Sequence, residues 1–180
     1  LDLADRGRSV LVVDKAPSIG GKMIALSKVF PTMDCASCIT TPRMSSAAHH
    51  DNVDIWVYSE VEALTPDPAG GFTATVRRKA TYVDEDTCIG CRLCEYACPV
   101  EVPHEFEGRM GARRAVYIPF GTAIPQNALI DADECIFCGK CEKACPTTPT
   151  AIDFTQQDRV ETLHIDATVL ATGYEVTPTT

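Results

Sequence analysis

Eight of the ten cysteines fall in two runs that share one spacing, C-x2-C-x2-C-x3-C-P. A cubane iron–sulfur core needs four thiolates around a compact centre. A tight loop can place three of them on one side when two residues separate each pair, and the fourth lies about one helical turn further on. The spacing therefore predicts two 4Fe–4S clusters ligated by cysteine.

In two-cluster modules of this kind, the fourth cysteine of each run ligates the other cluster. We therefore expect one cluster on Cys88, Cys91, Cys94 and Cys145, and the other on Cys135, Cys138, Cys141 and Cys98. The proline after each fourth cysteine should end a short helix. Two alternatives fit less well: zinc usually takes its ligands as two separated pairs, and disulfides need an oxidising compartment, to which nothing in the sequence points.

The remaining cysteines, Cys35 and Cys38, form a separate C-x2-C pair. Three interpretations stay open: half of a metal site, a redox dithiol, or two plain thiols. A dithiol would need one thiol of lowered pKa, but no His or Lys is adjacent to supply it.

Apolar periodicity indicates that the cysteine runs interrupt a strand-rich fold. A helix, a turn and a strand are expected over 1–15, loops with at most one short helix over 17–48, a hairpin or meander over 53–83, and a strand over 160–170. We therefore expect an incomplete α/β domain in 1–82, an inserted α+β ferredoxin-like domain in 83–155, and a return to the first domain in 156–180.

Three short segments predict a nucleotide site in the α/β part. Asp14, followed by Lys15, ends an apolar strand, where an acidic residue of dinucleotide-binding folds holds the ribose hydroxyls. Gly20 and Gly21 form a tight loop that a ligand can approach closely, and Gly173 follows a second apolar segment. The glycine fingerprint that should precede the first strand is not in this sequence.

Composition sets wider bounds. The 180 residues carry a net charge of −9, which argues against binding to a nucleic-acid backbone. The apolar runs are too short to span a membrane. The chain begins at Leu1 without an initiator Met or a signal peptide, so we expect a cytoplasmic protein and a sequence that is a fragment.

Taken together, these segments resemble the A-subunit family of heterodisulfide reductase and the related quinone-interacting oxidoreductase subunits of anaerobic sulfur metabolism. Besides the two cluster motifs, the resemblance is carried by VVDKAPSIGGKM, FPTMDCASCITTPRM, CPVEVPHEFEGRMGARRAVYIPF, AIDF and VLATGYE. The family resemblance implies a thioredoxin-reductase-like FAD domain, with FAD near Asp14, Lys15, Gly20, Gly21 and Gly173. It also implies that Cys35 and Cys38 help to ligate a third 4Fe–4S cluster shared with residues outside this sequence.

The resemblance further implies an oxidoreductase component that passes electrons between FAD and the clusters. It suggests flavin-based bifurcation and reduction of the CoM–S–S–CoB heterodisulfide, or a related disulfide, with partner subunits. Implied partners are other subunits of the complex, donors of the hydrogenase or formate dehydrogenase type, and ferredoxin. An electron carrier without flavin is the main alternative, and a regulatory cluster-binding scaffold is a third. The stretches PFGTAIP and CPTTPTAIDF depart from the family pattern.

Overall fold

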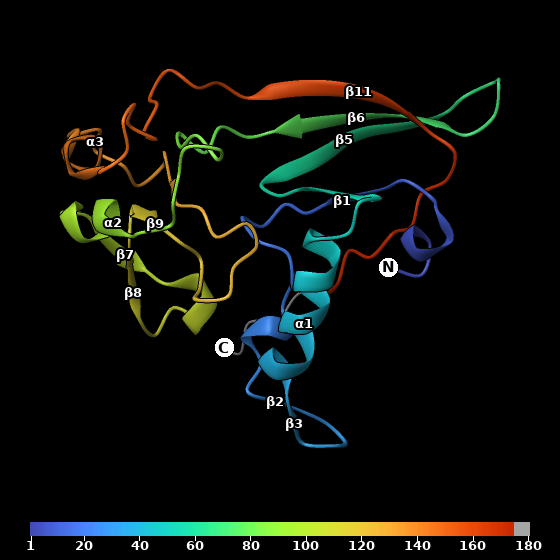
Figure 1. The fold of residues 1–180 in the computed structure, drawn as a ribbon, viewed down its shortest axis with the longest axis horizontal. Helices are drawn as coiled ribbons and strands as arrows, with labels where there is room; N and C mark the ends of the chain where they lie inside the picture. Colours follow the sequence, from blue (N-terminus) through green and yellow to red (C-terminus); the bar gives the residue numbers. More distant parts are fainter. Residues whose placement is uncertain (175–180) are drawn as a thin grey trace, which may run out of the picture.

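The largest sheet of the described residues has three antiparallel strands. The computed structural model describes residues 1–174. Strands β5 (Ser59–Pro66), β6 (Phe72–Arg78) and β11 (Arg159–Ile165) pair in the order β11-β6-β5 (Figure 1). The hairpin predicted within 53–83 is confirmed for β5 and β6, which are joined by a turn that contains Gly70 and Gly71.

A β–α–β unit lies beside this sheet. Strand β1 (Val10–Val13) pairs in parallel with β4 (Val53–Trp56), and the connection carries helix α1 (Ala36–Ala48). Parallel neighbours need such a crossover, because a tight turn can join only antiparallel strands. The expectation that 53–56 would join the meander is therefore wrong, since β4 pairs with β1 instead.

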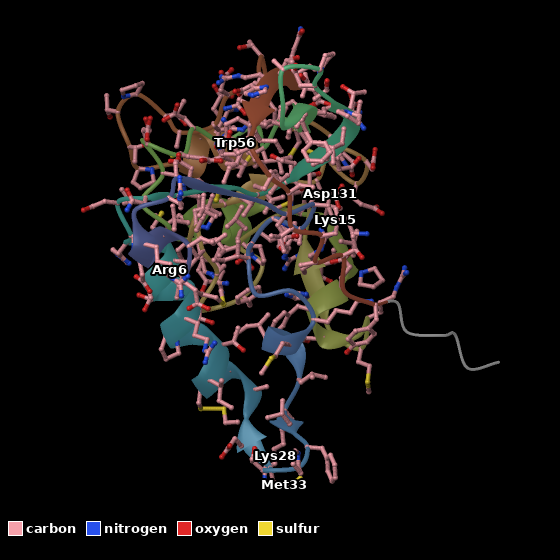
Figure 2. The ribbon with its side chains drawn as sticks, turned by 90° about the vertical axis from the view of Figure 1, so that its right-hand side faces the viewer. Arg6, Lys15, Lys28, Met33, Trp56 and Asp131 are labelled. Atoms are coloured by element: carbon pink, nitrogen blue, oxygen red, sulfur yellow. A yellow bond between two sulfur atoms is a disulfide. The ribbon has the colours of Figure 1, made fainter. Side chains whose placement is uncertain are left out.

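Helix α1 is the main element that the sequence did not predict in full. Loops were expected over 17–48, but thirteen of these residues form a helix that contains Pro42. Its side chain Met44 packs on Ile24 of the short 3-10 helix η2 (Met23–Ala25) and on Ile19, and this contact stabilises the helix despite the proline. Before α1, strands β2 (Lys28–Val29) and β3 (Asp34–Cys35) form a hairpin with Met33 near its tip (Figure 2).

The two cysteine runs lie in the segment between β6 and β11. It holds short helices α2 (Leu93–Ala97) and α3 (Lys140–Ala144), which pack together, the 3-10 helix η3 (Glu105–Glu107) and two strand pairs (Figure 1). The pairs are β7 (Glu101–Pro103) with β8 (Ala112–Arg114), and β9 (Val116–Tyr117) with β10 (Leu129–Ile130). Val116, Ile118, Ile130 and Ile152 form its core between the cysteines.

The ends of this segment come back together. Arg78 at the end of β6 is paired with Arg159 at the start of β11, and an isolated bridge joins Val83 to Ile152. The chain therefore leaves the sheet and returns to it at one point, as an inserted unit would.

The two ends of the described chain differ in part from expectation. The first turn is a 3-10 helix, η1 (Ala4–Arg6), and it ends at Gly7 in the left-handed conformation, with the glycine N–H donating to the Ala4 carbonyl. The strand expected over 160–170 ends earlier, at Ile165. Within residues 1–174, no helix is both long enough and apolar enough to cross a membrane.

Candidate metal centre

One group of four cysteines surrounds a cavity between α3 and the end of α2. The cavity has about 300 Å³ of empty space, its open mouth included. Its cysteines are Cys135, Cys138 and Cys141 from the second run and Cys98 from the first. Apart from these sulfurs, the lining is apolar and includes Val100, Val116, Ile130, Ile136 and Phe154.

The other four cysteines surround a second cavity of about 350 Å³, measured in the same way. They are Cys88, Cys91 and Cys94 from the first run and Cys145 from the second. The lining includes two polar side chains, Arg92 and Thr147. Each cavity therefore collects three thiols from one run and the fourth from the other, which is the grouping that the spacing predicts.

Left-handed backbone conformations shape the loop in each half. The residue before the second cysteine has φ of 65° at Gly90 and 51° at Phe137, and the residue after it has φ of 63° at Arg92 and 69° at Gly139. Alternation between right- and left-handed residues turns successive N–H groups inward and forms concavities that bind anions, including iron–sulfur clusters. Phe137 N donates to the Sγ of Cys135 at 3.3 Å in this way.

The third cysteine of each run is held inside. Cys94 in α2 and Cys141 in α3 are 8% and 7% exposed. Burial raises the pKa of the Cys94 thiol to about 12, and it raises the pKa of Cys141 as well. A thiolate is costly at these positions unless a cation compensates its charge, and a bound metal ion would supply that compensation.

The fourth cysteines occupy extended backbone directly before a proline. Cys98 has ψ of 127° and Cys145 has ψ of 124°, because the proline ring disfavours helical backbone in the residue before it. Their surroundings differ. Burial acts to raise the pKa of Cys145, but hydrogen bonds, the largest from Thr147, outweigh it and lower the pKa to about 7.

Cys35 and Cys38 lie together, away from the other eight. Their Sγ atoms are joined as a disulfide beside the first turn of α1 (Figure 2), with the two Cα atoms 5.2 Å apart. Cys35 is the N-cap, and its Sγ accepts a hydrogen bond from the Cys38 N–H at 3.2 Å. Within the described 174 residues, no three His, Cys, Asp or Glu side chains converge as the ligands of a single metal ion would.

The predicted nucleotide residues flank the β–α–β unit. Asp14 follows β1, and its Oδ1 accepts a hydrogen bond from Ala16 N at 2.9 Å, while the next residue, Lys15, is exposed. The residues next to the predicted glycines are in contact: the Nζ of Lys22, which follows Gly21, donates to the carbonyl of Tyr174, which follows Gly173, and lies 5.0 Å from the centre of its ring.

The two loop glycines have different reasons to be glycine. A Cβ on Gly20 would meet the Met44 Sδ at 2.8 Å, so this position is fixed by packing. A Cβ on Gly21 or Gly173 would meet nothing within 4 Å, so only the positive φ that they share with Gly20 favours glycine there.

Two buried polar groups outside the cysteine motifs were not predicted from the sequence. Ser18 is 3% exposed, and its Oγ accepts from Ile124 N at 2.8 Å, which ties the first part of the chain to the inserted segment. The Arg113 side chain is 4% exposed and bonds to Glu105 and Asp131, with its guanidinium 4.1 Å from the centre of the Tyr117 ring. Both contacts join residues that no local motif connects.

The fold of the inserted segment and its two cysteine-lined cavities define a class. The family model for the 4Fe-4S dicluster domain matches residues 87–150, which span both cysteine runs. The chain therefore contains a 4Fe–4S dicluster domain of the ferredoxin type.

Curated relatives extend the similarity over nearly the whole chain. The chain is 49% identical, over 97% of its length, to the first of two iron–sulfur A-subunits of CoB–CoM heterodisulfide reductase in Methanopyrus kandleri. It is 46% identical, again over 97%, to the A-subunit of the H(2)/formate:CoB-CoM heterodisulfide,ferredoxin reductase of Methanococcus maripaludis. Over the stretch that it spans, the chain is a homologue of the A-subunits of heterodisulfide reductase. It covers 26% of the length of each of these two relatives.

Proposed function

We propose that this chain is the iron–sulfur segment of a heterodisulfide reductase-like A-subunit, and that it carries single electrons on two 4Fe–4S clusters. The observation that carries the proposal is the exchange of fourth cysteines between the two cavities. The proposed ligands are Cys88, Cys91, Cys94 and Cys145 for one cluster, and Cys135, Cys138, Cys141 and Cys98 for the other.

The chemistry of the donor set supports this assignment. Each cavity combines four thiols with a mainly apolar lining, and in each a backbone N–H reaches a cysteine sulfur, that of Phe137 at Cys135 and that of Ala151 at Cys145. Thiolates suit iron, and amide donors balance the negative charge of the sulfurs. When bound, each cluster takes up and releases one electron at a time. The cysteine side chains would hold each cluster in its cavity. The buried Val116 and Ile130 pack among the cysteines and keep water out of the core between them.

We extend the proposal to FAD, with Asp14, Lys15, Gly20, Gly21 and Gly173 as its binding residues. Three observations support it: the β–α–β unit, the acidic residue at the carboxyl end of β1, and the Lys22–Tyr174 contact that brings the two glycine segments together. Ligands of open α/β sheets bind at that end of the strands. The division into 1–82, 83–155 and 156–180 belongs to the same proposal.

The relatives' names guide the wider proposal. They name a CoB–CoM heterodisulfide reductase, and one also names hydrogen, formate and ferredoxin. We propose that the chain works with partner subunits of such a complex and that a flavin there divides electron pairs between two acceptors. We further propose that Cys35 and Cys38, once two electrons have reduced their disulfide to thiolates, contribute to a third cluster completed by residues outside this sequence.

The direct test is the cofactor content of the anaerobically purified chain. We expect about eight irons and about eight acid-labile sulfides per chain, since each cubane holds four of each. EPR after dithionite reduction should show two interacting clusters, and a flavin spectrum is recorded on the same sample. Zinc in place of iron would contradict the cluster assignment, and full iron without flavin would contradict the FAD extension alone.

A further inference from the structure

The two halves of the dicluster domain differ at one corresponding position beside the fourth cysteine. The first run continues Cys98-Pro99-Val100, and the second continues Cys145-Pro146-Thr147. Val100 and Thr147 line the two cavities at equivalent points. Valine and threonine have nearly the same shape, so the difference between the halves here is a single hydroxyl group in place of a methyl group.

That hydroxyl is aimed at a proposed ligand sulfur. The Oγ1 of Thr147 lies 3.1 Å from the Sγ of Cys145. The N–H of Ala151 donates to the same Oγ1 at 3.0 Å, and it also lies 3.4 Å from the sulfur. Because the hydroxyl accepts from Ala151, its own proton is available to the sulfur, and a thiolate ligand can only accept it.

The corresponding sulfur of the other half has a different neighbour. The Sγ of Cys98 faces the Val100 carbonyl oxygen at 3.9 Å, which is an acceptor and offers a thiolate nothing. In that cavity, the N–H of Phe137 reaches the Sγ of Cys135. Among the described residues, the cavity with Cys145 therefore has a hydroxyl donor to its fourth sulfur, and the cavity with Cys98 does not.

Solvent exposure does not separate the two sites. The innermost cysteines, Cys94 and Cys141, are 8% and 7% exposed, and each cavity has one exposed cysteine, Cys91 or Cys138. Cluster type is the same in both by proposal. Two features of the lining differ, the cationic side chain of Arg92 and the hydroxyl of Thr147, and both belong to the cavity with Cys145. Of these two, the Thr147 hydroxyl is the one placed to hydrogen-bond a ligand sulfur, which is a factor that sets the reduction potential of a cluster.

We propose that Thr147 raises the reduction potential of the cluster on Cys145 above that of the cluster on Cys98. A hydrogen bond to the sulfur stabilises the extra negative charge of the reduced state, and it is therefore stronger after reduction. In the proposed transfer, the cluster on Cys98 is oxidised by one electron and the cluster on Cys145 is reduced by it, with no bond made or broken. The proposal rests on the cluster assignment above.

The test is an EPR-monitored redox titration of the cluster-loaded chain and of Thr147→Val. We expect the higher of the two midpoint potentials to fall and the lower one to stay in place. A tenfold change in the equilibrium between the clusters corresponds to about 59 mV for one electron, and a shift of that order is expected. Iron content, measured on each sample, should stay near eight per chain.

Val100→Thr is the matched control, because it makes the same exchange in the other half. It should leave the higher potential unchanged, and any shift that it causes should fall on the lower one.

If both clusters are present and Thr147→Val moves neither potential, or moves both equally, the inference is overturned while the proposed function stands. If Thr147→Val loses iron, a rise of the lower potential in Val100→Thr still supports it, and a rise of the higher one refutes it. A wild-type chain without clusters would overturn the proposed function and this inference together.

Discussion

At the scale of the residue, crossed ligation can be tested by pairing substitutions. Cys98→Ala with Cys135→Ala removes two ligands that the structure places around one cavity, so about four of eight irons should remain. Cys98→Ala with Cys88→Ala removes one ligand from each cavity, so both clusters should be lost. Iron and sulfide analysis measures both variants. If the first pair lost all iron and the second kept half, each run would hold its own cluster.

A second residue-scale prediction concerns the buried Arg113. Its Nε lies 2.6 Å from Glu105, and a terminal nitrogen lies 2.7 Å from Asp131. Removing one partner of such a group leaves uncompensated charge, so Arg113→Ala should destabilise the fold by about 3 kcal/mol. Anaerobic thermal unfolding followed by circular dichroism measures the shift in midpoint.

The adjacent Arg114 supplies the control. It pairs with Glu101 at the surface, so Arg114→Ala should cost about 0–1 kcal/mol. Equal midpoints for Arg113→Ala and Arg114→Ala would contradict the role given to Arg113.

The hydrogen bond from Arg113 lowers the pKa of Glu105. This pair therefore stabilises the fold fully at neutral pH, and its contribution is lost as the pH falls through the lowered pKa.

The residues of the site differ in how far the sequence reveals them. The cysteine grouping follows from spacing, because the size of a cubane fixes how many residues lie between its ligands. Thr147 is also close to Cys145 in the sequence. The role of its hydroxyl, however, depends on the N–H of Ala151, which donates to it only once the chain has folded back. Ser18 and Ile124 lie 106 positions apart, and only the folded chain brings them together.

At the scale of the element, the N-terminus of α1 holds the third cysteine pair. The structure pairs Cys35 with Cys38 and with no other cysteine of the described chain. Cys35→Ala with Cys38→Ala should therefore leave the irons of this chain at about eight. The measurement is iron content beside a thiol count of the denatured protein. Loss of about four irons would show that the pair is required for one of the two clusters.

The elements also show where periodicity is a good guide. Strands β5 and β6 were predictable because alternating side chains face two sides, with Ala74 and Val76 buried on one of them. Helix α1 was not, since Pro42 lacks an N–H and ordinarily ends a helix. The parallel partner of β4 could not be predicted either, because the strand is short and its pairing is decided by the crossover rather than by its own residues.

At the scale of the whole molecule, a contact that is partly apolar and partly polar joins the dicluster domain to the first part of the chain. Phe106, Phe120 and Ile124 of the dicluster domain pack against the cluster of Ile19, Ile24 and Met44. The segment that supplies Phe120 and Ile124 is PFGTAIP. A firm contact here matters for the proposed function, since electron transfer between an α/β cofactor site and the clusters requires a fixed separation.

Ser18 is the polar part of that contact, and its removal should loosen it. The Oγ accepts from Ile124 N at 2.8 Å and lies 3.1 Å from the Ile124 carbonyl, so Ser18→Ala leaves a buried N–H without its partner, at a cost of about 1–3 kcal/mol. Hydrogen exchange should become faster at residues 120–125, while iron content stays at about eight because no cysteine is touched.

Ser46→Ala removes an exposed hydroxyl that bonds only to the Pro42 carbonyl, and it should leave exchange in 120–125 unchanged. If Ser18→Ala left exchange unchanged as well, the apolar contacts and the backbone hydrogen bond from Ile19 N to the Ile124 carbonyl would be enough to hold the dicluster domain in place. If it lost iron instead, the contact would be part of what keeps the clusters bound.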